Sequence, residues 1–387
     1  MIYLDNNATT PLDAEVKKAM AEAFEVFGNP SSGHAAGRAA KALVEGARGR
    51  VAGLIGCRPE EIVFTSGGTE ANNLAIVGTA HKLGRGHIIT SVIEHPSVAN
   101  PVRWLEAHGF EVSRLPVDSE GRVSPADVKK ALRKDTILIT VMHSNNETGA
   151  LQPVSEIGEI ARSYDIPFHS DAAQSVGKME MKVGRLLPVD MLTIVPHKFY
   201  GPKGVGALYI RGFGSGQPNM PRNMVVSGHV PHPVLFGAGH ESGMRPGTEN
   251  ITGIAGLGKA CEVAARALPT GYGHMLMLRD NLHRMLAEGL AIKLNGPPAL
   301  RLPNTLNVSV RGILAENVVA QVKDVLAIST GSACHSGTRI PSSVLKTMGL
   351  SDEDALSSLR LSVGKYNTAE EIEEVSEILT SCIRRQL

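Results

Sequence analysis

Several sequence signals are scarce in this chain, and their scarcity excludes whole classes of protein. Only 4 cysteines are present, and they lie far apart at Cys57, Cys261, Cys334 and Cys382, with no C-x-x-C pair. We therefore expect neither a disulfide framework nor a structural zinc site, and we expect a reducing compartment. The formal net charge is +1, which gives no reason to expect nucleic acid or a membrane surface as a partner.

Long apolar runs are missing as well. No run approaches the length of a membrane span. The start of the chain, Met1 to Asn7, has neither the basic nor the apolar region of a secretory signal. We therefore expect a cytoplasmic protein that is not held in a membrane.

The chain has an ordinary globular composition and enough length for two domains. Of its 387 residues, 42% are hydrophobic and 20% are charged, and 41 are glycines. This length exceeds that of a typical single domain, so one large and one smaller domain are expected. The many glycines indicate close backbone approaches in loops.

From about residue 60, short β-rich runs alternate with helical patterns, as in a mainly parallel sheet covered by helices on both faces. Seven runs are predicted to be strands, namely 62–66, 87–91, 110–115, 136–142, 166–170, 191–195 and 205–210. Such a sheet binds its ligand at the carboxyl ends of its strands. Polar clusters follow several of these runs, so the sequence predicts one site at that edge.

The composition changes after about residue 211. Residues 212–239 are rich in Gly, Pro, Met and Asn, and they are predicted to form a long irregular connection of a kind that is usually functional. A smaller α/β unit is expected to follow, with helices at 251–267 and 370–385 and strands at 306–310, 325–329 and 359–363.

The most informative stretch, Pro196 to Gly204, follows a predicted buried strand and holds Lys198 between a histidine and several glycines. Lysines avoid interiors unless they are paired or used, because desolvation penalises the ammonium group. A partly desolvated lysine can form a Schiff base with an aldehyde such as pyridoxal phosphate (PLP). Asp171 ends another apolar run, where its carboxylate could pair with a protonated pyridine nitrogen.

Other polar residues follow neighbouring strands. The turn Gly67–Gly68 before a helix beginning at Thr69 could bind a phosphate, although it could also be an ordinary capped turn. His95 could stack on a flat ring or move protons, or be only a hydrogen-bonded loop residue. Asn146 and Gln174 suit a polar ligand, but such residues also cap helices and form turns.

Two further residues carry chemistry in the C-terminal part. Cys334 lies in a loop of small residues next to His335, where a thiol is poorly buried and can become a nucleophilic thiolate. The other three cysteines fit helical patterns and are interpreted as structural. Arg360 alternates with apolar residues on a strand and could clamp a substrate carboxylate, or pair with a nearby acid on an edge strand.

Taken together, these motifs resemble those of the cysteine desulfurases and selenocysteine lyases, which are PLP enzymes of the aspartate-aminotransferase fold (fold type I). The resemblance spans nearly the whole chain, in the segments 4–11 (LDNNATTP), 28–32 (GNPSS), 65–70 (TSGGTE), 145–149 (NNETG), 171–174 (DAAQ), 197–204 (HKFYGPKG), 245–250 (RPGTEN) and 331–334 (GSAC). It implies a large PLP-binding domain with a seven-stranded sheet at 12–255. It also implies a small domain made of 1–11 and 256–387, with a cysteine loop at about 329–341.

The resemblance also implies a role for each site residue. Lys198 would hold PLP and move the Cα proton, Asp171 would face the ring nitrogen, Gln174 the ring hydroxyl, and His95 would stack on the ring. Gly68, Thr69 and His197 would hold the phosphate, and Thr248 would reach the phosphate in the partner subunit of a homodimer. Asn146 and Arg360 would grip the substrate carboxylate, and Cys334 would take sulfur from L-cysteine as a persulfide, leaving L-alanine, for delivery to an acceptor protein that the sequence does not identify.

One departure from the family pattern concerns the phosphate. Many members have a serine two residues before the histidine of the lysine motif, and this chain has Val195 there, which removes one expected phosphate hydrogen bond. The main alternative function is that of a selenocysteine lyase, which would release selenide. An aminotransferase or β-lyase of the same fold would not need Cys334. A catalytically inactive binding subunit would be expected to lack Lys198 or Asp171, and a nicotinamide enzyme would need a GxGxxG turn, which Gly67–Thr69 does not supply.

Overall fold

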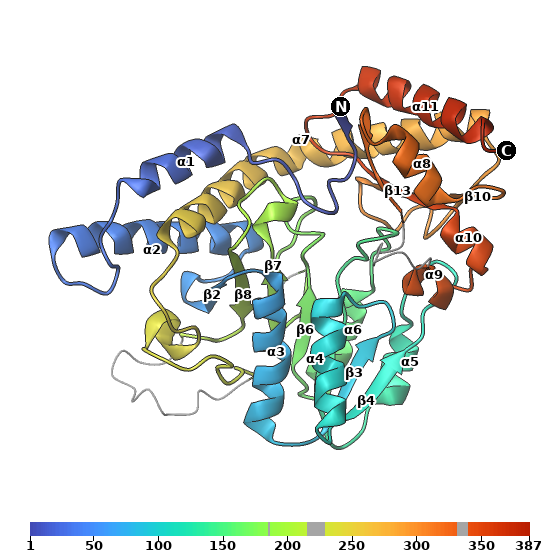
Figure 1. The fold of residues 1–387 in the computed structure, drawn as a ribbon. Helices are drawn as coiled ribbons and strands as arrows, with labels where there is room; N and C mark the ends of the chain where they lie inside the picture. The colour runs from blue at the N-terminus through green and yellow to red at the C-terminus, as the bar shows by residue number, and fades with distance from the viewer. Residues whose placement is uncertain (185, 215–228, 331–339) are drawn as a thin grey trace.

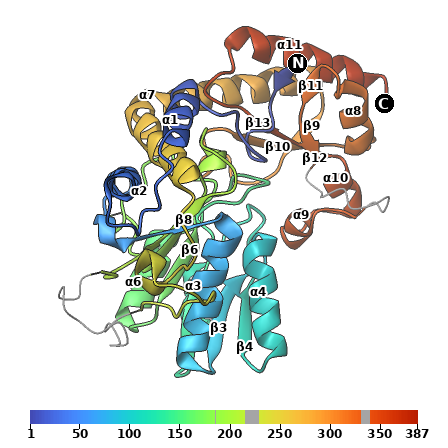
Figure 2. The same cartoon turned by 60° about the vertical axis from the view of Figure 1, so that its left-hand side comes forward.

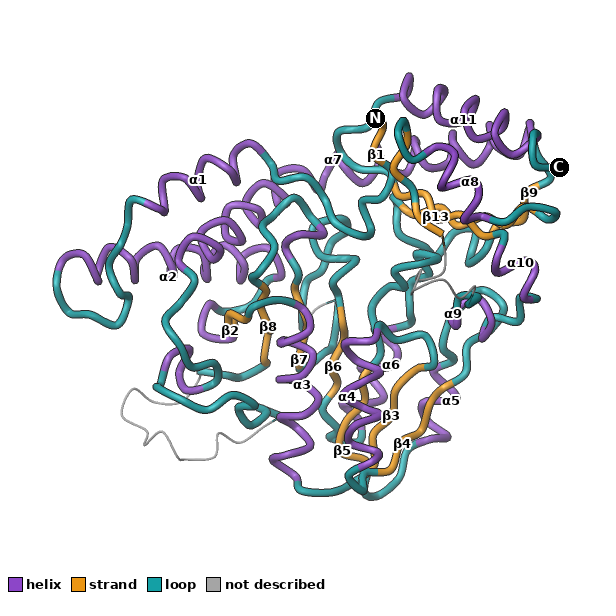
Figure 3. Tube along the Cα trace, in the orientation of Figure 1, coloured by secondary structure: helices purple, strands orange, loops and turns teal. Residues whose placement is uncertain are grey.

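The computed structural model describes residues 1–184, 186–214, 229–330 and 340–387. Its centre is a seven-stranded sheet (Figures 1 and 3). The order across the sheet is β2 (Ile62–Thr65), β8 (Gly206–Ile210), β7 (Met191–Ile194), β6 (Phe168–Asp171), β5 (Thr136–Thr140), β3 (His87–Ser91) and β4 (Glu111–Leu115). The pairs from β7 to β4 are parallel, and β8 is antiparallel to both of its neighbours. The predicted α/β class and all seven predicted strands are confirmed, with ends shifted by up to two residues.

Alternating apolar side chains give this sheet two buried faces. Ile88 and Met191 belong to one core cluster, whereas the next residues in each strand, Ile89 and Leu192, belong to another. This alternation follows from the two-residue period of a strand. Helices cover both faces, which explains why the strands have apolar residues in nearly every position.

The helices that cover the sheet are α3 (Gly68–Leu83) and α4 (Pro96–Ala107) on one face, with α2 (Ala35–Ile55), α5 (Pro125–Ala131), α6 (Val154–Ser163) and the first half of α7 on the other. The helix α1 (Ala14–Phe24) packs against α7, which also packs against α2. In Figure 1, α3 and α4 cross in front of the strands.

A second, smaller unit lies beside the carboxyl edge of the large sheet, and both chain ends lie in it (Figures 1 and 2). It contains a four-stranded antiparallel sheet with the order β12 (Ser329–Thr330), β13 (Ser358–Ser362), β10 (Thr305–Val310) and β9 (Ile292–Leu294). The remaining elements are α8 (Ala315–Val322), α9 (Ser343–Thr347), α10 (Asp352–Leu356), α11 (Ala369–Arg384) and the pair β1 (Ile2–Tyr3) and β11 (Leu326–Ala327).

The two units share the helix α7 (Ile251–Gly289), which has 39 residues. The sequence predicts a helix at 251–267, so this prediction is correct in type but too short. Pro269 lies inside α7 without ending it. The helix continues because its first half buries residues such as Leu257 in the core of the large sheet, and its second half buries residues such as Leu282 in the core of the smaller unit.

Two other details differ from the predictions. The single strand expected at 325–329 is divided, because β11 pairs with β1 while β12 pairs with β13 in another sheet. Arg360 lies on β13, which has neighbours on both sides, so it is not an edge-strand residue. Within the described residues, no helix is both long and apolar enough to cross a membrane.

Candidate active site

A cavity of about 370 Å³ opens at the carboxyl edge of the large sheet. Five strands deliver residues to it, because the chain turns there after β2, β3, β5, β6 and β7. Residues from the N-terminal segment and from β13 close the other side. Of the residues predicted for the site, those that line this cavity are Gly68, Thr69, His95, Asn146, Asp171, Gln174, His197, Lys198 and Arg360.

Lys198 ends a 3₁₀ turn, Pro196–Lys198, that directly follows β7. Its Nζ donates hydrogen bonds to the carbonyl oxygens of Asn7, at 2.6 Å, and Ala8, at 2.8 Å. Burial, together with the charge of Arg360, lowers the pKa of Lys198 to about 8, although Asp171 and Asp5 act in the opposite direction. At pH 7 about a tenth of Lys198 is therefore a neutral, nucleophilic amine, far more than for a lysine with the ordinary pKa of about 10.4.

Asp171 and His95 also line the cavity, from different elements. Asp171 is the last residue of β6, and its Oδ1 accepts a hydrogen bond from the backbone N–H of Ala173 at 3.0 Å. His95 is the N-cap of α4, and its Nδ1 accepts from the backbone N–H of Ser97 at 3.1 Å. The His95 ring is open to the cavity, yet the surrounding protein lowers its pKa by desolvation, opposed by Asp171. A neutral, flat ring therefore lies near a carboxylate.

The first turn of α3 forms another wall. Gly67, the N-cap, has a φ of +154°, which favours glycine. A Cβ on Gly68 would lie 2.7 Å from the Cγ2 atom of Val195, so a larger residue would clash there. The backbone N–H groups at a helix start have no partner within the helix and attract anions. Gly68 and Thr69 therefore offer an anion site, and Val195 adds no hydrogen-bond donor to it.

Arg360 faces the cavity from the smaller unit. Its Nη2 donates to Asp5 Oδ1 at 2.9 Å, and its Nη1 donates to the backbone oxygen of Asn146 at 3.3 Å. Its Nε is buried and has no hydrogen-bond partner among the described residues. The guanidinium group is therefore held in place, and its Nε–H can still donate a hydrogen bond to an anionic ligand.

One predicted site residue among those that the structure describes does not line this cavity. Thr248 is exposed and lies outside the cavity lining. Cys334 lies outside the described residues.

The structure adds three groups that the sequence motifs do not predict, namely the carbonyl oxygens of Asn7 and Ala8 and the hydroxyl of Ser97. Backbone acceptors have no sequence signature. Ser97, however, follows directly after the His95–Pro96 helix start and could have been noticed as a partner for His95.

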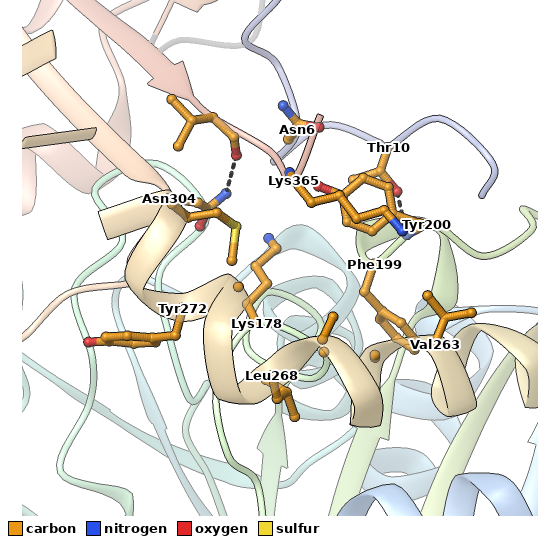
Figure 4. A pocket seen from close by; sticks show the side chains of 16 residues that line it. Asn6, Thr10, Lys178, Phe199, Tyr200, Val263, Leu268, Tyr272, Asn304 and Lys365 are labelled. Atoms are coloured by element: carbon orange, nitrogen blue, oxygen red, sulfur yellow. Dashed lines mark hydrogen bonds between the residues drawn. The ribbon is translucent and has the colours of Figure 1, made fainter. Parts of the chain in front are cut away.

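A second, much smaller cavity of about 30 Å³ lies against α7 (Figure 4). Its walls include Val263 and Leu268, and Lys178, whose Nζ donates to Gln174 Oε1 at 2.9 Å. A cavity of this size holds about one or two water molecules. Of these two cavities, only the one at the sheet edge has room for a cofactor and a substrate.

The larger cavity fits pyridoxal phosphate on chemical grounds. A nucleophilic lysine suits the aldehyde, a carboxylate suits the ring nitrogen, and a helix start with a close-packed glycine suits the phosphate. Gln174 offers its Nε2 group, which donates to the carbonyl oxygen of Asn7 at 2.9 Å, as a donor near the ring. Each chemical feature of the cofactor therefore has a counterpart among the cavity residues.

Comparison with known proteins identifies relatives that match over the full chain. The aminotransferase class-V family model matches residues 2–375. The cysteine desulfurase IscS of Dictyoglomus turgidum is 45% identical over 389 residues, which cover 99% of this chain and 95% of the relative. Among solved structures, a NifS-like protein superposes with a TM-score of 0.89 at 34% identity, covering 99% of both chains. The structure of SspA in complex with cysteine has a TM-score of 0.81 at 36% identity and covers 95% of this chain and 100% of SspA. The chain thus belongs to the aminotransferase class-V family and, within it, to the cysteine desulfurases.

Proposed function

We propose that this protein is a PLP-dependent cysteine desulfurase that converts L-cysteine to L-alanine and transfers the sulfur to Cys334. The observation that carries the proposal is the presence of Lys198, Asp171 and Arg360 in one cavity, in a chain that belongs to the cysteine desulfurases. The bound cysteine in the similar SspA structure supports the choice of substrate. In the overall transfer, the carbon–sulfur bond of cysteine breaks, a sulfur–sulfur bond to Cys334 forms, and the thiol proton balances the new C–H bond of alanine.

PLP supplies the electron sink that makes the substrate Cα–H bond acidic. We infer that Gly68, Thr69 and His197 hold its phosphate. Burial, with help from Lys198, lowers the pKa of His197 to about 4, so this ring is neutral and can donate a hydrogen bond. His95 covers the ring face, and Gln174 donates to the ring hydroxyl.

Within that arrangement, Asp171 stabilises the positive charge on the ring nitrogen, because a carboxylate beside a cation favours the charged form. Lys198 would be the base for the Cα proton, since its lowered pKa favours the neutral amine that can accept a proton.

We expect PLP capture by the cofactor-free protein to accelerate as the pH rises through about 8, the pKa of Lys198. Only the neutral amine attacks the aldehyde, so a lowered pKa makes the reaction fast at lower pH than for an ordinary lysine, whose pKa is about 10.4. Growth of the visible absorbance band, measured by stopped flow across the pH range, reports the rate. A rate that still rises steeply near the ordinary lysine value would show that burial does not lower the pKa.

We infer that Arg360 and Asn146 bind the substrate carboxylate. Replacing Arg360 with lysine should raise KM for L-cysteine by about tenfold or more and change kcat less, because lysine cannot form the paired hydrogen bonds of a guanidinium group. Steady-state kinetics measures both parameters. Arg311→Lys is the matched control, since Arg311 is exposed and pairs with Asp354 Oδ1 at 2.9 Å, away from the cavity. An unchanged KM in Arg360→Lys would remove this residue from substrate binding.

The assay that tests the function is alanine release from L-cysteine and from L-selenocysteine, measured side by side for the wild-type protein. Turnover of L-cysteine with persulfide formation is the expected result. Turnover of L-selenocysteine alone would instead identify a selenocysteine lyase, the alternative that the sequence leaves open. None of the relatives described above is named a selenocysteine lyase.

We propose further that the protein works as a homodimer, in which Thr248 reaches the phosphate site of the partner subunit. The exposure of Thr248 outside its own cavity supports this placement. Light scattering measures the particle mass, and a mass equal to a single 41.0 kDa chain would contradict it.

Three further assignments remain proposals. A division into a large domain at 12–255 and a smaller domain at 1–11 and 256–387 is one of them. The two separate core clusters support two domains, but Leu257 and Ala264 pack in the core of the large sheet, which favours a boundary further along α7. Delivery of the persulfide to an acceptor protein follows from the chemistry of the transfer. A cytoplasmic location is supported by the three described cysteines, which are all free.

A further inference from the structure

One buried amide links the two residues expected to meet the cofactor ring. Asn72 lies on α3, its side chain is 1% exposed, and it is not part of the cavity lining. Its Nδ2 donates to Asp171 Oδ2 at 2.8 Å and to Ser97 Oγ at 2.8 Å. Its Oδ1 accepts a hydrogen bond from Thr193 Oγ1 at 2.6 Å. Asn72 therefore joins α3 to β6, α4 and β7 behind the cavity.

The orientation of this amide follows from its partners. An ionised carboxylate only accepts hydrogen bonds, so the nitrogen of Asn72 must face Asp171. Its oxygen then faces Thr193, whose hydroxyl hydrogen is used in that bond. The Thr193 oxygen lies 3.1 Å from His169 Nε2, so it accepts from that nitrogen. His169 Nδ1 in turn accepts from Thr140 Oγ1 at 2.9 Å.

Burial stabilises this arrangement. Thr140, His169 and Thr193 are each 0% exposed, so none can exchange its partner for water. Burial also lowers the pKa of His169 to about 4, which keeps the imidazole neutral and leaves it one donor and one acceptor. Each group therefore donates a hydrogen bond to the next, from Thr140 through His169 and Thr193 to Asn72. Breaking any of these bonds leaves a buried polar atom without a partner.

A second set of hydrogen bonds connects Asn72, through Ser97, to His95. Ser97 Oγ accepts from Asn72, so its own hydrogen is free to be donated to His95 Nδ1, which lies 2.7 Å away. The backbone N–H of Ser97 points to the same nitrogen. His95 Nδ1 is thus an acceptor, and the neutral ring carries its proton on Nε2.

We propose that Asn72 is a positioning residue that keeps the Asp171 carboxylate oriented toward the cofactor's ring nitrogen, while holding Ser97 in line with His95. A hydrogen bond donated to a carboxylate favours its charged form. Without that bond the Asp171 carboxylate loses the donor that fixes its orientation, so its ion pair with the protonated ring nitrogen weakens. The ring then loses positive charge, and the electron sink weakens. The proposal rests on the proposed function, because it requires PLP in the cavity.

The test measures the protonation of the ring nitrogen directly. Full-length wild-type protein and Asn72→Leu, a variant of similar size with no amide, are loaded with PLP labelled with ¹⁵N in the ring, and the nitrogen resonance is recorded by NMR. We expect a protonated nitrogen in the wild type and a shift toward the unprotonated position in Asn72→Leu. We also expect about a tenfold rise in the cofactor dissociation constant, the scale of one lost hydrogen bond to a charged group.

Three variants separate positioning from general damage. Thr79→Val removes a buried hydroxyl from the same helix, where it bonds only to the Ala75 carbonyl at 2.6 Å, and should leave the resonance unchanged. Ser97→Ala removes only the hydrogen bonds that connect Asn72 to His95, and it should also leave the nitrogen resonance unchanged. Thr193→Val keeps Asn72 but removes the bond to its oxygen, so a smaller shift in the same direction is expected; it replaces Asn72→Leu if that variant does not fold.

Two outcomes would overturn the proposal. The first is a ring nitrogen that stays as protonated in Asn72→Leu, or in Thr193→Val where that variant takes its place, as in the wild type. The second is an equal shift in Thr79→Val, which would mean a general loss of packing. A wild-type protein that binds no PLP would instead refute the proposed function, so the two failures are distinguishable.

Discussion

Lys198→Ala is expected to lose both the visible absorbance band of the lysine-bound cofactor and the release of alanine from L-cysteine. No other lysine lines the larger cavity among the described residues, so no second amine is placed to capture the aldehyde there. Loss of the base for the Cα proton adds to the effect, and together we expect a fall in turnover of about a thousandfold or more. Absorbance spectra and an alanine assay on the purified variant measure the two losses.

Lys203→Ala serves as the control for this experiment. Lys203 belongs to the same glycine-rich segment, but its side chain is exposed and does not line the cavity. This variant should keep the visible band and most of the activity. A visible band that survives in Lys198→Ala would assign the cofactor to another amine and would refute the central role of Lys198.

Cys334→Ala is expected to abolish sulfur transfer while leaving the visible band in place. The reason is chemical: the sulfur of the substrate needs a thiolate acceptor, and without it alanine release and persulfide formation stop together. Mass spectrometry of the wild-type protein after incubation with L-cysteine should show one added sulfur, which the variant lacks. We expect residual turnover below about one hundredth of the wild-type value.

Cys57→Ala is the matched control for the thiol. Cys57 follows the end of α2, and burial, helped by the nearby Glu61, raises its pKa to about 12, so it is not ionised near neutral pH. Its removal should change neither activity nor the added sulfur. If Cys334→Ala kept full alanine release, the protein would work as an aminotransferase or β-lyase of this fold, since neither reaction requires that thiol.

Much of the large sheet could be predicted because a strand is recognised from residues that are close together in the sequence. A strand has a two-residue period and a limited length, so runs such as 191–195 could be recognised from neighbouring residues alone. Helix starts were equally local, since the helix expected to begin at Thr69 starts one residue earlier, at Gly68. The end of α7 could not be predicted, because Pro269 is a local stop signal that packing against two cores overrides.

The chemical character of the site follows from residue types alone, since Lys198, Asp171 and Arg360 each carry their chemistry wherever the fold places them. How these groups are held depends on the packing of elements that are distant in the chain. Asn72 and Asp171 are 99 positions apart, and Lys198 and Asn7 are 191 apart, yet each pair is hydrogen-bonded. Such contacts depend on how whole helices and strands pack together. The order of residues along the chain does not directly show which distant residues will meet. The same packing removes water from Lys198 and lowers its pKa, which turns a common residue into a reactive one.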